Sequence, residues 1–123
     1  MTTQRLMADR FREIAAWRRR KAEEYDRDAR NLRCAAGLEE LADFVLELPQ
    51  DDARIRELTR LTVLGEAFEP GQQTAYEIGR FRFHHPEVGL DAFLDRLVEL
   101  ATADRGEMGR FGGRLPEGDD PWG

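Results

Sequence analysis

The fold is decided by residues 3–36, which read TQRLMADRFREIAAWRRRKAEEYDRDARNLRCAA without glycine or proline. Apolar side chains recur there every three or four residues, which places them along one side of an α-helix. This stripe comprises Met7, Phe11, Ile14, Ala22, Tyr25, Ala29, Leu32 and Ala36. Alanine also recurs every seventh residue, and small side chains let a neighbouring helix pack closely. The pattern predicts a single helix over 3–36, about 50 Å long at 1.5 Å per residue.

In the rest of the chain, the spacing of apolar residues predicts shorter helices, which begin after Gly37. Their four ranges are 38–48, 53–64, 72–82 and 91–104. From residue 105 onward glycine and proline are frequent, which indicates a flexible tail over 105–123. We therefore expect an all-α protein of about five helices, in which the long N-terminal helix and a short-helix bundle over 38–104 form one domain spanning 1–104.

Composition narrows the possible functions. A chain of 123 residues with 41% hydrophobic and 36% charged residues fits one highly charged helical domain. Its net charge of −6 argues against a nucleic-acid module, which needs a basic surface. The charge is uneven, since residues 1–33 carry +4 and residues 34–123 carry −10. We expect the basic first helix to lie against its own acidic domain.

The cellular location is also predicted from these features. The chain begins with charged residues rather than the apolar core of a signal peptide, and no apolar run approaches the ~20 residues of a membrane span. The single cysteine, Cys34, cannot form an internal disulfide and suits a reducing compartment. We expect a cytoplasmic protein with no membrane contact.

The length of the predicted first helix indicates self-association. The other predicted helices have roughly 11–14 residues and are about 16–21 Å long, so no one of them can cover a helix of about 50 Å. A projecting apolar seam would be exposed in a monomer, and a second copy would cover it. We therefore expect a homodimer. The predicted association residues are Met7, Phe11, Ile14, Ala15, Trp17 and Ala22.

A basic segment in the middle of the same helix gives an alternative function. Arg18, Arg19, Arg20 and Lys21 follow Trp17, and a basic helix with an aromatic side chain can lie along phosphates. Acidic side chains within one or two turns dilute this patch. A nucleic-acid-associated regulator is therefore the second hypothesis, behind protein–protein association.

The third hypothesis is a small metal-binding protein or enzyme centred on His84, His85 and Glu87. These residues have the chemistry of metal ligands, but adjacent histidines point in different directions on a regular backbone. Cys34 has no histidine near it in sequence and is expected to be an inert thiol. The sequence shows no phosphate-binding loop or nucleophile motif. We expect no cofactor and no metal, and a non-catalytic protein rather than an enzyme.

The predicted tail contains three large apolar side chains, Phe111, Leu115 and Trp122, among glycine, proline and acidic residues. Such side chains either fold back over their own domain or fill a pocket of a partner protein. Together these patterns predict a small helical protein that acts through protein–protein contacts, as an assembly, adaptor or regulatory subunit.

Overall fold

The computed structural model describes residues 2–24, 28–63 and 67–111. Its elements in chain order are α1 (Thr3–Glu24), α2 (Ala29–Glu47), α3 (Ala53–Leu58), the 3₁₀ turn η1 (Thr59–Leu61), β1 (Thr62–Val63), β2 (Ala67–Phe68), α4 (Gln72–Gly79) and α5 (Leu90–Phe111). The described residues thus contain five α-helices, the first of them long. The predicted all-α class, with about five helices and a long one at the N-terminus, is confirmed.

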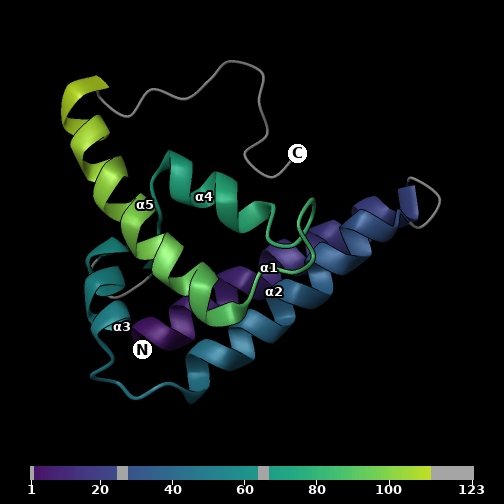
Figure 1. Cartoon of the computed structure of the whole chain (residues 1–123), viewed down its shortest axis with the longest axis horizontal. Coiled ribbons are helices and arrows are strands. Elements are labelled where there is room, and N and C mark those ends of the chain that lie inside the picture. The colour runs from purple at the N-terminus through teal and green to yellow at the C-terminus, as the bar shows by residue number, and fades with distance from the viewer. Residues whose placement is uncertain (1, 25–27, 64–66, 112–123) are drawn as a thin grey trace.

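The predicted single helix over 3–36 is wrong, because α1 and α2 form an antiparallel hairpin (Figure 1). Asp28 has non-helical backbone angles, φ −48° and ψ 115°, and its side chain accepts a hydrogen bond from the backbone N–H of Arg30. It is therefore the N-cap of α2. The guanidinium of Arg30 also lowers the pKa of the Asp28 carboxyl. A helix start in this place divides the apolar stripe between two helices that face each other.

Three other boundaries differ from the sequence-based prediction. The helix predicted over 53–64 ends at Leu58, and η1 and the short β1–β2 hairpin follow it. The helix predicted over 72–82 ends at Gly79. The last helix continues to Phe111, seven residues beyond its predicted end, so the predicted tail begins too early. The remainder of that tail, residues 112–123, lies outside the described residues.

The core is formed where β2 and α3 pack against α1 of the α1–α2 hairpin, and α5 packs beside α3 and α4 (Figure 1). Phe11 of α1 meets Phe68 of β2 edge-on, with ring centroids 6.3 Å apart. The ring centroid of Phe81, just after α4, lies 4.2 Å from the ring centroid of Phe93 in α5. The largest fully buried side chains are Phe11, Phe81, Met7, Ile14, Leu38, Leu41, Leu58, Ile78, Leu94, Leu97, Val45 and Thr74. Aromatic contacts therefore join the hairpin to β2, and the segment after α4 to α5.

Polar side chains fix the ends of the helices. The buried amide of Gln4 in α1 donates to the carbonyls of Val45 and Leu48, at 2.8 and 2.6 Å, where α2 ends. Carbonyls in the last turn of a helix have no partner within the helix, so this contact satisfies them. Arg54 of α3 pairs with Asp91 and Asp95 of α5, which joins these two helices.

Gly37, which the sequence predicted as a helix break, lies in the middle of α2. A Cβ atom there would approach Arg82 Cδ to 3.0 Å and the ring of Phe81 to 3.2 Å. Glycine at this position therefore allows the segment after α4 to touch the backbone of α2.

We predict that Gly37→Leu destabilises the protein by about 1–3 kcal/mol, because the new side chain overfills this contact. Ala36→Leu is the matched control, since Ala36 is exposed on the same helix and should change stability by less than about 0.5 kcal/mol. Urea unfolding of both variants measures the difference. Equal stabilities would contradict the close approach.

Candidate functional site

The residues predicted to form an exposed association seam lie in the core of a single chain. Met7, Phe11, Ile14, Ala15 and Ala22 are at most 1% exposed. Trp17 is partly buried. The prediction of an exposed seam is therefore wrong for these five buried residues, because α2 of the same chain supplies the neighbouring helix that a second copy was expected to supply. Homodimer formation itself remains a prediction and needs a different surface.

The basic segment of α1 does not form a continuous basic face. Arg18 is only 4% exposed. Its Nε and Nη2 atoms donate to the carbonyl of Gly79 at 3.0 and 2.7 Å, and Nη1 donates to Asn31 Oδ1 at 3.0 Å. Arg19 forms a two-point pair with Glu39 of α2. Because these two arginines contact their own chain, the nucleic-acid hypothesis loses half of its predicted contacts.

The other two basic side chains remain at the surface. Lys21 pairs with Glu24 at 3.3 Å and lies over the ring of Trp17. Arg20 is exposed on α1. An exposed arginine beside a paired lysine is an ordinary solvated helix face and gives no specific polyanion site.

The histidine pair predicted as a metal candidate has little organisation. His84 packs edge-on against Phe83 with ring centroids 4.8 Å apart. His85 Nδ1 lies 3.6 Å from Glu87 Oε1, and both side chains are largely exposed. Within residues 2–24, 28–63 and 67–111, no group of three or more His, Cys, Asp and Glu side chains is placed to hold a metal ion. The geometry of the loop therefore gives the metal hypothesis no support.

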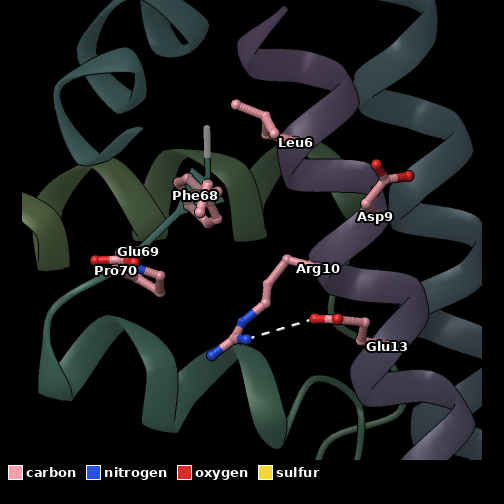
Figure 2. A pocket seen from close by; sticks show the side chains of 8 residues that line it. Leu6, Asp9, Arg10, Glu13, Phe68, Glu69 and Pro70 are labelled. Carbon is pink, nitrogen blue, oxygen red and sulfur yellow. Dashed lines mark hydrogen bonds and ion pairs between the residues drawn. The ribbon is translucent and has the colours of Figure 1, made fainter. Parts of the chain in front are cut away.

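A first hollow of about 500 Å³ lies between α1 and residues 67–70 (Figure 2). Leu6 and Phe68 supply its apolar lining, and the carboxylates of Asp9, Glu13 and Glu69 lie around it with Arg10. Figure 2 shows Arg10 directed toward Glu13, and their closest atoms are 3.4 Å apart. Solvated carboxylates on a helix face are common, so this acidic hollow has no arrangement that defines a ligand.

A second hollow, of about 370 Å³, lies between α4, the connection after it and the start of α5. We call it the arginine–aromatic groove; its lining residues are Tyr76, Glu77, Arg80, Phe81, Arg82, His84, His85, Val88, Ala92, Phe93 and Arg96. Buried Phe81 and Phe93 form its floor. Tyr76 is 47% exposed, and the guanidinium carbon of Arg80 lies 3.5 Å from the centroid of its ring. The groove thus presents a cation stacked on an aromatic face.

The wall of the groove is held rigidly by Arg82. This residue has a φ of 60°, a left-handed conformation that costs energy in a residue other than glycine. Its Nε donates to the carbonyl of Val88 at 2.9 Å, and Nη1 pairs with Glu40 of α2 at 2.8 Å. Two fixed contacts therefore maintain the strained turn.

Among the groove residues, His84 and His85 were predicted from the sequence as metal candidates, but the cluster of Tyr76, Arg80 and Arg96 was not predicted as a site. Tyr76 lies in α4, and Arg80, four residues later, is the C-cap of this helix. Side chains touch at this spacing on a helix, and this was the available signal. The contribution of Arg96 from α5 depends on tertiary packing, which no local pattern records. Of the predicted tail anchors, Phe111 ends α5, while Leu115 and Trp122 lie outside the described residues.

No helix in the described part of the chain is both long enough and apolar enough to cross a membrane. No family model matches the chain, and no curated protein or solved structure is significantly similar to it. The functional argument therefore depends on the geometry of this chain alone.

We predict that Arg18→Met destabilises the protein by about 2–3 kcal/mol, because it leaves the buried carbonyl of Gly79 and the amide of Asn31 without their charged donor. Arg20→Met is the matched control at an exposed position two residues away, and it should be nearly neutral. Denaturant unfolding of both variants measures the effect. Similar midpoints would show that Arg18 is not a core residue.

Cys34 gives a pH-dependent prediction. Its thiol is fully buried, 3.4 Å from the Gly79 carbonyl, and burial raises its pKa to about 11 although nearby arginines oppose the shift. Because the folded state favours the protonated thiol, stability should be constant below the ordinary thiol pKa of about 9 and fall between about pH 9 and 11. The Cys34→Ala variant should lack this component of the fall in stability.

Alkylation of Cys34 at neutral pH should also require unfolding, because the thiol is buried. Rapid alkylation of the folded protein would contradict this burial.

Proposed function

We propose that this chain is a small non-catalytic helical protein that acts through protein–protein association, as an assembly, adaptor or regulatory subunit. Its arginine–aromatic groove receives an acidic segment of a partner protein. The observation that carries the proposal is the exposed Tyr76 ring with the Arg80 guanidinium stacked on it at the edge of the groove. Tyrosine and arginine are, with tryptophan, the side chains most enriched among the dominant contacts of protein interfaces.

The charge of the groove favours an acidic partner segment. Three arginines line it against one glutamate, although the whole chain carries a net charge of −6. Arginine binds carboxylates through two parallel hydrogen bonds, which gives direction as well as attraction. The pair between Arg96 and Glu99 is exposed and 3.4 Å long, so a partner carboxylate can replace Glu99 at small cost.

The surroundings of the groove favour a short peptide over a nucleic acid. Glu40, Glu87 and Glu99 lie beside groove arginines or histidines and would repel a long phosphate backbone. A peptide with a few acidic residues and an aromatic side chain needs only the groove itself. Its aromatic ring can extend the stack of Tyr76 and Arg80, where a cation over a ring adds attraction.

A peptide-display selection against the immobilised full chain tests this proposal. Enriched sequences should be rich in Asp and Glu and contain an aromatic residue. Arg80→Ala and Tyr76→Ala should each weaken the best selected peptide by about tenfold, the effect expected of a dominant contact. Arg20→Ala, an exposed arginine of α1, should leave its affinity unchanged. Unfolding midpoints of the three variants confirm that each is folded.

Three outcomes would contradict the proposal. The first is the absence of acidic enrichment, and the second is a peptide affinity that Arg80→Ala and Arg20→Ala reduce equally. The third is tighter, salt-dependent binding of a labelled single-stranded oligonucleotide that Arg80→Ala weakens, because this would assign the groove to nucleic acid.

A further inference from the structure

The chain itself contains a segment whose chemistry complements the groove. Residues 114–123 read RLPEGDDPWG and combine the carboxylates of Glu117, Asp119 and Asp120 with the indole of Trp122. We propose that this segment docks in the arginine–aromatic groove of its own chain and must leave before a partner's acidic segment can bind. The inference deepens the proposed function, on which its regulatory part rests.

The segment is long enough to reach the groove. Arg96 lies fifteen residues before Phe111 in α5, a distance of about 22 Å along the helix axis. The eleven residues from Gly112 to Trp122 can span about 36 Å when extended. Two consecutive glycines, Gly112 and Gly113, follow the helix and permit the chain reversal that such a return needs. Because α4 packs beside α5 (Figure 1) and Arg96 of α5 lines the groove, a chain that returns along α5 would meet the groove.

Charge favours docking of the segment in the arginine–aromatic groove over docking in the first hollow. The first hollow is bordered by three carboxylates, Asp9, Glu13 and Glu69, against Arg10 alone, and it would repel three further carboxylates. The arginine–aromatic groove has the opposite balance, with Arg80, Arg82 and Arg96 against Glu77. The indole of Trp122 is the aromatic group best suited to stack with a guanidinium, and Arg80 is already stacked at the groove edge.

The fluorescence of Trp122 tests the docking directly. Trp17→Phe removes the other tryptophan, so that emission and acrylamide quenching report Trp122 alone in the full chain. We expect blue-shifted emission and protection from acrylamide. Arg80→Glu combined with Arg96→Glu should shift the emission to the red and abolish the protection. Arg20→Glu, which reverses an exposed charge outside the groove, should change neither.

A reciprocal variant separates docking from a structural effect of the groove changes. Asp119→Arg combined with Asp120→Arg should also abolish the protection. Joining both pairs of charge reversals should restore it, because each new arginine then faces a new glutamate. The inference is overturned if Trp122 is quenched as freely as N-acetyltryptophanamide in the parent protein, or if neither pair of reversals alters the quenching.

Concentration distinguishes docking within a chain from docking on a second copy. Protection should persist on dilution, and light scattering should show the same mass for the parent and for Trp122→Ala. If the protection of Trp122 from acrylamide and a dimer both disappear on dilution, docking within the chain is overturned and the segment is placed on a neighbouring copy.

Competition tests the regulatory part. A groove occupied nine-tenths of the time by its own segment binds a selected acidic peptide about tenfold more weakly, so Trp122→Ala should bind that peptide about tenfold more tightly than the parent does. Equal affinities would reject the regulation and leave the proposed function intact. Failure of every acidic peptide to bind even Trp122→Ala would reject the proposed function, whereas the fluorescence result would still stand.

Discussion

The buried guanidinium of Arg18 holds together the parts of the chain that form the groove. It reaches from α1 to the carbonyl of Gly79, where α4 ends, and to Asn31 of α2. Its central carbon lies 4.6 Å from the ring centroid of Phe83. The last carbonyls of a helix carry partial negative charge, so a buried cation is well placed there. The end of α4 is thereby attached to the hairpin, and the direction of the following connection depends on that attachment.

The same connection is held from α2 by two further contacts. Arg33 donates to the carbonyls of Arg82 and Phe83 at 2.8 and 2.6 Å. Gly37, one helical turn later, leaves room for Phe81 and for the stem of Arg82. The left-handed turn at Arg82 persists because the surrounding contacts determine its conformation. The groove is therefore a consequence of how α2 receives the chain after α4, and its floor is part of the main core.

The features that depend on local periodicity could be predicted from the sequence. The features that depend on a single residue or on a long-range contact could not. The three-and-four spacing identified helical segments throughout, and the expected pairing of basic and acidic regions is seen in the ion pairs of Arg12 with Asp43 and Arg19 with Glu39. The break before α2 was missed because the periodicity continues across it and only the capping side chain of Asp28 marks it. Arg18 was assigned to the surface because charge normally indicates exposure, and its buried acceptors come from distant segments.

The location of the apolar seam determines what kind of association remains possible. In the described residues, the apolar stripe of α1 is covered by its own chain, so it cannot drive a permanent hydrophobic interface. A hollow of about 370 Å³ holds only a few side chains. An obligate dimer instead buries an extended, largely hydrophobic surface. Contacts made there through arginine and tyrosine are partly electrostatic and weaken with salt. We therefore expect the proposed association through this groove to be reversible, which is the property that an occupant supplied by the same chain requires if it is to be exchanged for a partner.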